Sequence, residues 1–95
     1  MKRMEETRQA LQEKIERKKK YIAHLMENIA DYGNKAFSEM KEDNSSWAFE
    51  YIETIESWTK EIQQERQAIT SLYQQIRLID YLMKEGEQHD KERND

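Results

Sequence analysis

The stretch IESWTKEIQQERQAITSLYQQI, residues 55–76, decides the fold, because isoleucine returns in it at every seventh position. The repeated residues are Ile55, Ile62, Ile69 and Ile76, and Met83 takes the next place in the series. Apolar residues at this interval keep one face of a long helix turned toward a partner helix. The spacing therefore predicts a coiled-coil helix, and it does not by itself indicate a function.

Composition points to one helical domain. The 95 residues include 38% charged residues, 36% apolar residues, two glycines and no proline. A chain of this length is too short for two independent cores, and the absence of proline removes the strongest interruption of long helices. The apolar residues are periodic rather than sparse, which favours folding over disorder despite the high charge. We therefore expect an all-α protein with a single domain over residues 1–85.

Two apolar seams run along the chain, one in each half. The first follows the alternating three- and four-residue spacing of heptad positions a and d, and only Arg8 and Lys18 interrupt it. It consists of Met4, Leu11, Ile15, Ile22, Leu25, Ile29, Tyr32 and Ala36. The second seam has the isoleucines at a, one charged interruption at Glu65, and the d residues Tyr51, Trp58, Leu72 and Ile79. The seams predict one helix over 4–42 and another over 47–85.

A polar cluster joins the two predicted helices. Residues 41–46 read KEDNSS, and the last four of them are all good helix caps. A turn at 41–46 folds the helices into a long antiparallel hairpin of the coiled-coil type. Residues 86–95 contain no apolar side chain, so we expect them to form a disordered polar tail.

The turn limits the register between the helices. The register that fits best places Leu11 opposite Ile76 and continues in layers toward the turn. The remaining opposed pairs are Ile15 with Leu72, Leu25 with Ile62, Ile29 with Trp58, Tyr32 with Ile55 and Ala36 with Tyr51. Lys18 and Glu65 then fall in adjacent layers. They can form an ion pair that specifies the register, or both can extend outward to water along their apolar stems.

Gly33 is the point at which the first helix is most open to interruption. Glycine followed by asparagine, as in Gly33-Asn34, commonly ends a helix with a left-handed residue. The apolar spacing nevertheless continues beyond it to Met40. We therefore expect a continuous helix with a kink or a close helix contact at Gly33, and a separate short helix over residues 35–42 is the alternative.

Apolar residues also lie outside both seams. They are Tyr21, Met26, Phe37, Met40, Phe49, Ile52, Tyr73, Leu78, Tyr81 and Leu82. An isolated hairpin leaves them uncovered, and symmetric homodimers are the commonest oligomers. We expect a second copy to cover them in a dimeric four-helix bundle, and a different protein bound to the same residues is the alternative. In an antiparallel dimer the basic segment 1–20 of one copy would lie near the acidic turn end of the other.

The turn end carries the candidate partner-binding residues. They combine aromatic rings with acidic side chains and are Phe37, Trp47, Phe49, Glu50 and Glu53. Aromatic residues, tryptophan above all, are enriched where proteins bind one another. Trp47 stands outside the d series, which suits an interface, and packing as a staple over the turn is the alternative.

A basic segment offers a candidate nucleic-acid contact. Its residues are Lys14, Arg17, Lys19 and Lys20, and clustered Lys and Arg side chains can contact phosphates. Consecutive helical residues point in different directions, however, and the net charge of −4 opposes approach to a phosphate backbone. A solvated basic face is the simpler interpretation.

The sequence offers no constellation typical of catalysis, a cofactor or a membrane span. It has no cysteine and no glycine-rich phosphate loop, and His24 lacks a second ligand set for a metal. No apolar stretch approaches the roughly 20 residues that cross a bilayer, and none follows the first residues as in a signal peptide. We therefore expect no enzyme activity, cofactor, metal, membrane contact or small-molecule substrate.

The remaining hypothesis is a small, cytoplasmic, regulatory or adaptor protein of bacterial or phage type. It would self-associate and bind another protein. Nucleic-acid binding through the basic segment, and a structural role in a larger assembly, are the alternatives.

Overall fold

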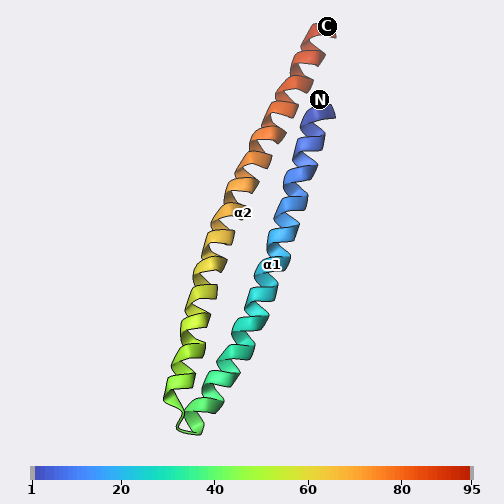
Figure 1. The fold of residues 1–95 in the computed structure, drawn as a ribbon. Coiled ribbons are helices and arrows are strands. Elements are labelled where there is room, and N and C mark those ends of the chain that lie inside the picture. The colour runs from blue at the N-terminus through green and yellow to red at the C-terminus, as the bar shows by residue number, and fades with distance from the viewer. Residues whose placement is uncertain (1, 95) are drawn as a thin grey trace.

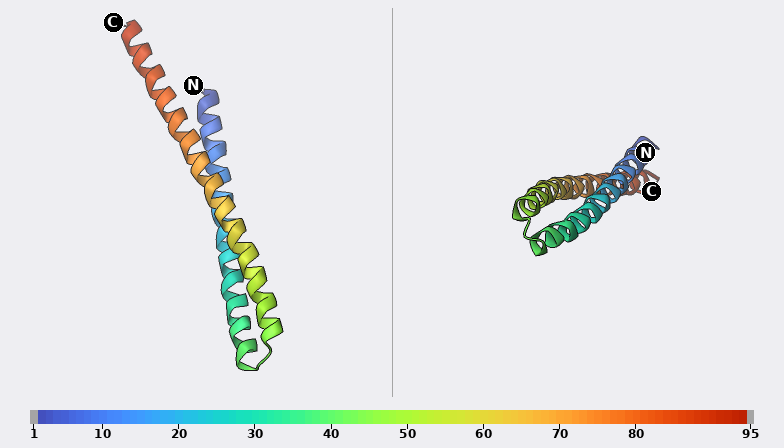
Figure 2. Two further views of the ribbon diagram at one scale, coloured as in Figure 1. Left: turned by 90° about the vertical axis from the view of Figure 1, so that its left-hand side faces the viewer. Right: turned by 60° about the horizontal axis from the view of Figure 1, so that its bottom comes forward.

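The computed structural model is an antiparallel hairpin of two long helices (Figure 1). It describes the backbone of residues 2–94 and the side chains of residues 2–86. Helix α1 spans Lys2–Lys41 and helix α2 spans Ser45–Asn94. Together they form a rod of 79 × 15 × 14 Å, along which the helices cross at a shallow angle (Figure 2). The predicted all-α hairpin is confirmed.

Helix α1 runs without interruption through Gly33. The glycine keeps a helical backbone and has no positive φ. The continuous helix is therefore confirmed, and the alternative of a short helix over 35–42 is excluded. A Cβ atom added at Gly33 would meet no other atom within 4 Å. A close helix contact, which was one of the two alternatives expected here beside a kink, is therefore wrong within the hairpin.

The connection between the helices is shorter than the sequence predicted. It consists of residues 42–44 rather than 41–46, because both serines already belong to α2, which begins at Ser45. The first helical bond of α2 runs from the N–H of Ala48 to the carbonyl of Asn44, over 3.2 Å. Asn44 is therefore the capping position among the four polar residues that suited it.

The end of α1 explains why the turn is so compact. Asp43 adopts a left-handed backbone with a φ of 65°. Its N–H donates to the carbonyl of Met40 over 3.2 Å, and the N–H of Asn44 donates to the carbonyl of Glu39 over 2.8 Å. These two bonds form a Schellman ending, which satisfies carbonyls that the last helical turn leaves free.

Helix α2 differs from the prediction at its far end. The backbone is helical to Asn94, whereas the apolar spacing predicted an end at residue 85. That boundary is therefore wrong. The predicted polar tail falls largely on residues 87–95, whose side chains lie outside the described part of the chain, and it stays a prediction.

The core is one line of seam residues between the helices. Its tightest part is Ile15, Leu72 and Ile76, each at most 6% exposed, with Leu11 and Ile69 packed against them. Burial of this set removes apolar surface from water, which is the main favourable term in folding. The contacts confirm the predicted register at this layer.

Near the turn the seam changes to aromatic and small residues. The Tyr32 ring lies edge-on to those of Tyr51 and Trp58, with centroids 5.1 and 4.7 Å away. Ala36 and Ala48 are buried. Ala48 stands seven residues before Ile55 and is the earliest member of the series. It was not predicted as a seam residue, because alanine does not stand out from the helix-forming residues around it.

Candidate interaction surfaces

Lys18 and Glu65 form an ion pair inside the seam. Lys18 Nζ lies 2.9 Å from Glu65 Oε2, and each side chain is 23% exposed. The predicted pairing is therefore confirmed over the alternative in which both side chains extend apart into water. A partly buried pair adds little net stability, but a slip of register would leave each charge alone in the seam.

Arg8, the other charge in the first seam, forms an ion pair that was not predicted from the sequence. Arg8 Nε donates to Asp80 Oδ1 over 2.6 Å, and Nη2 lies 3.4 Å from Oδ2. The hydrogen bond to Asp80 raises the pKa of Arg8 above its ordinary value. The predicted register places Arg8 beside Ile79, so the carboxylate at the next position could have been found from that register.

Two faces flank the seam, and one contact defines each. On one face, Lys19 Nζ lies 5.6 Å from the centroid of the Tyr73 ring. On the other, the hydroxyl of Tyr21 donates to a carboxylate oxygen of Glu61, which is the largest reason that the pKa of Tyr21 is raised. Residues two apart on a helix point about 200° apart, so these contacts lie on opposite sides of the rod. We name them the Tyr73 face and the Glu61 face.

Exposed apolar residues gather on the Tyr73 face near the turn. Residues seven apart share a face of a coiled-coil helix, so this face continues from Lys19 to Met26 and from Tyr73 back to Ile52. We define the turn-end apolar patch as Met26, Ala30, Gly33, Phe37, Met40, Phe49 and Ile52. Phe37 is 64% exposed and Met26 is 58% exposed. The patch therefore lies open to water on the single hairpin.

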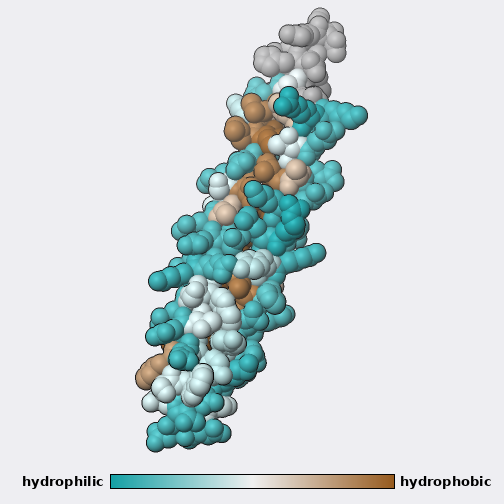
Figure 3. All heavy atoms as spheres, in the orientation of Figure 1, coloured by the Kyte–Doolittle hydropathy of each residue, from teal (hydrophilic) through white to brown (hydrophobic). Residues whose placement is uncertain are grey.

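A second apolar group lies at the other end of the rod. We define the open-end apolar patch as Leu78, Tyr81 and Leu82, of which Leu78 is 58% exposed. Leu82 belongs to the Glu61 face, and beside it Met4, Thr7 and Ile79 line a shallow groove of about 300 Å³ together with Arg3. Figure 3 shows apolar residues gathered toward the end at which the two termini lie. The two patches thus lie at opposite ends and on opposite faces.

The five candidate partner-binding residues are all exposed, but heptad position separates them. These residues are Phe37, Trp47, Phe49, Glu50 and Glu53. Phe37 and Phe49 belong to the turn-end apolar patch. Trp47, 58% exposed, stands two heptads before Glu61 and so lies on the Glu61 face, with the acidic residues directed outward from α2. The set is therefore two surfaces rather than one.

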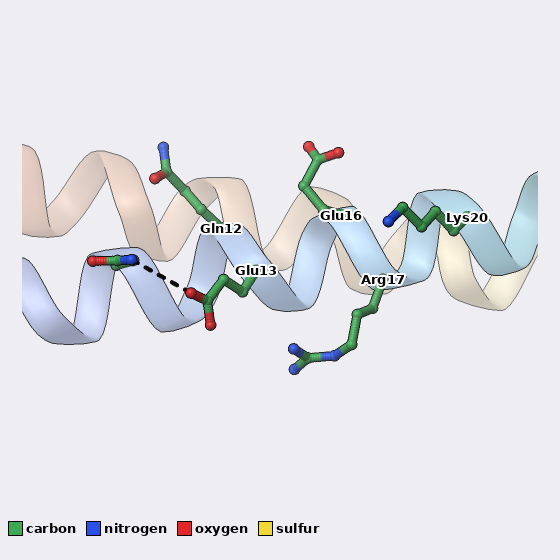
Figure 4. A pocket seen from close by; sticks show the side chains of 6 residues that line it. Gln12, Glu13, Glu16, Arg17 and Lys20 are labelled. Atoms are coloured by element: carbon green, nitrogen blue, oxygen red, sulfur yellow. Dashed lines mark hydrogen bonds between the residues drawn. The ribbon is translucent and has the colours of Figure 1, made fainter.

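The four candidate nucleic-acid contacts also point in different directions. Lys19 Nζ lies 3.6 Å from Glu16 Oε1 and stands over the Tyr73 ring. Lys14 lies on the Glu61 face with Tyr21. Arg17 and Lys20 line a shallow surface groove of about 430 Å³ on α1. The other lining residues are Gln9, Gln12, Glu13 and Glu16. Figure 4 shows the carboxylates of Glu13 and Glu16 next to Arg17 and Lys20 along the same groove, and they dilute its positive charge.

Elsewhere on the described rod, side chains that can bind a metal ion or transfer a proton do not form a cluster. His24 contacts Asn28, with Nε2 and Nδ2 3.4 Å apart. Among the described residues no three His, Cys, Asp or Glu side chains are placed to hold one metal ion. In the same part of the chain, neither helix has an apolar segment long enough to cross a membrane.

Comparison of the chain with protein-family models, with curated proteins and with solved structures gives no match.

Proposed function

We propose that the protein is a non-enzymatic protein–protein interaction module, of the regulatory or adaptor kind, that self-associates and binds another protein. The observation that carries the proposal is the pair of exposed apolar patches on a hairpin whose seam is already filled. Exposed apolar patches rimmed by polar residues are typical of surfaces that another protein covers. The two grooves described above, on α1 and beside Ile79, are shallow. Shallow grooves suit the docking of a helix or an aromatic side chain.

The partner-binding role belongs to Trp47 with Glu50 and Glu53. An exposed tryptophan beside carboxylates combines a large apolar contact with charges that can select a basic partner. This set lies apart from the turn-end apolar patch, so a partner can bind it while the patch is occupied.

The test is capture by immobilised protein, with each bound protein identified and its affinity then measured. We expect Trp47→Ala to weaken capture at least tenfold while the helical circular dichroism is unchanged. Tyr73→Ala serves as the control, because Tyr73 is an exposed aromatic residue, at 42%, that belongs to neither apolar patch and lies on the face opposite Trp47. Equal affinities for the wild type and the Trp47 variant, or loss of helicity in that variant, would overturn the assignment.

Nucleic-acid binding is the second candidate, because Lys14, Arg17 and Lys20 form no ion pair with any described side chain. Phosphate contacts are strongest at low ionic strength. Fluorescence anisotropy with single- and double-stranded oligonucleotides at low salt decides this candidate. Binding that falls steeply with salt and disappears in the Arg17→Gln, Lys20→Gln variant would support it.

A further inference from the structure

We infer that the turn-end apolar patch is where two copies of this chain pair, with α1 of one copy antiparallel to α1 of the other. The inference rests on the self-association in the proposed function and assigns it a surface and a direction. A second copy of the chain covers the patch. Two features support this pairing: the sizes of the apolar residues along α1, and the charges at the two ends of that apolar stripe that have no partner within the hairpin.

The apolar stripe on α1 has large residues around a small centre. Ala30 and Gly33 are in the middle, Met26 lies one turn before them, and Phe37 and Met40 follow. The space above Gly33 is open, since an added Cβ would meet nothing within 4 Å. A helix backbone can therefore approach closely at this point.

Two such stripes interlock when they run in opposite directions. The stripe residues alternate between two heptad positions. In an antiparallel pair, each residue at one of these positions faces a residue at the other position on the second copy, just as a faces d in the hairpin seam. Gly33 of one copy then faces Ala30 of the other, and Phe37 faces Met26. Met40 faces Ala23, which continues the stripe with one more small residue. Each large side chain in this register has an apolar neighbour, and the two backbones meet where both residues are small.

Charges that the hairpin leaves unpaired supply the direction. Residues 39–56 contain six acidic residues and one basic residue, whereas residues 14–20 contain five basic residues and one acidic residue. None of the six acidic side chains forms an ion pair with a described residue, and neither does Lys20. The register set by Gly33 and Ala30 places the turn residue Asp43 of each copy at the level of Lys20 of the other.

The alternative in-register pairing places both turns at the same end. It would bring two strongly acidic segments together and leave both basic segments uncompensated. Like charges placed across an interface oppose association and select against that arrangement. The antiparallel pairing instead joins the acidic end of each hairpin to the basic half of the other.

Such pairing leaves the other surfaces free. Trp47 and Leu82 of the open-end apolar patch belong to the Glu61 face, on the far side of the rod from the contact. A dimer would therefore present two copies of the Trp47 surface and two of the open-end apolar patch, so a partner protein could bind bivalently.

Sedimentation equilibrium tests the surface. Met26 and Leu78 are both 58% exposed, so Met26→Glu and Leu78→Glu make the same chemical change at matched sites. We expect Met26→Glu to raise the dimer dissociation constant at least tenfold, or about 1.4 kcal/mol, and Leu78→Glu to change it less than threefold. A dimer that is weakened by Leu78→Glu and not by Met26→Glu overturns the inference and leaves self-association intact. If the wild-type protein stays monomeric up to about 10⁻⁴ M, which corresponds to a binding free energy weaker than about 5–6 kcal/mol, both this inference and the proposed self-association are overturned.

Cysteine cross-linking tests the direction in a chain that has no cysteine of its own. We expect Lys20→Cys mixed with Asp43→Cys to give a cross-linked heterodimer with a short bismaleimide. Within one chain the two positions are about 35 Å apart at 1.5 Å per residue, so the product must join two copies. Cross-linking of Asp43→Cys to itself, without the mixed product, would show in-register pairing and overturn the antiparallel assignment.

Discussion

Lys18 and Glu65 show at the residue scale how a charge can be kept in an apolar seam. Either charge alone in the seam would lower the free energy of unfolding, because a buried charge without a partner is costly. The two form an ion pair instead, with an Nζ–Oε2 distance of 2.9 Å and the same partial exposure. Arg8 with Asp80 is a second ion pair between the helices, and Tyr21 donates a hydrogen bond between them to Glu61. Pairing across the helices therefore marks the register at three points along the rod.

The seam ion pair predicts an asymmetry between single and double substitutions. Lys18→Met leaves Glu65 without its partner, and we expect it to lower the free energy of unfolding by about 1–2 kcal/mol, between the values for exposed and buried pairs. Replacing both by leucine should be neutral or stabilising, because it extends the apolar seam. Urea unfolding at a concentration below dimerisation measures both. A double variant less stable than Lys18→Met would contradict this account.

Tyr21 predicts a specific loss of stability at alkaline pH. Its hydrogen bond to Glu61 raises its folded pKa above the ordinary 10.0. The contribution is therefore complete below pH 10 and is lost as the pH rises through the folded pKa. Tyr21→Phe should remove this part of the alkaline destabilisation, measured as the urea midpoint from pH 8 to pH 11. Tyr81→Phe is the exposed control, and a profile for Tyr21→Phe that matches the wild type would refute the role of the bond.

At the scale of the helices, the heptad spacing predicted most of the fold. Both helices, their antiparallel order and the layer around Ile15 and Leu72 follow from where apolar residues recur. The turn was less predictable, because several consecutive polar residues suit a cap and the choice depends on which residue takes the left-handed backbone. Asp43 takes it, which sets the capping position at Asn44. The candidate surfaces were only partly predictable, because exposed residues obey the same spacing whether they meet water or a partner.

Gly33 gives a prediction for α1 as an element. Its Cβ position is empty and its backbone is helical, so Gly33→Ala should stabilise the isolated hairpin by about 0.5–1 kcal/mol through helix propensity. Thermal unfolding below the concentration of dimerisation measures this effect. The same substitution should weaken dimerisation, because it fills the point of closest approach. A destabilised hairpin would mean that the glycine is needed within the chain itself.

At the scale of the whole molecule, the rod is polarised in both charge and hydropathy. Its acidic end carries the turn-end apolar patch on the Tyr73 face, and its other end carries the open-end apolar patch on the Glu61 face. A rod of this kind can pair through the turn-end apolar patch and keep both the Trp47 surface and the open-end apolar patch open to a partner. This division is the physical basis for proposing that the protein both self-associates and binds a partner.

Small-angle X-ray scattering, at a concentration where the mass is that of a dimer, tests the central claim most directly. Two rods of 79 Å that overlap over about 24 residues, or about 36 Å, should give a maximum dimension of about 120 Å. A dimeric mass with a maximum dimension of about 80 Å, the length of one rod, would contradict the antiparallel pairing of the turn-end apolar patches.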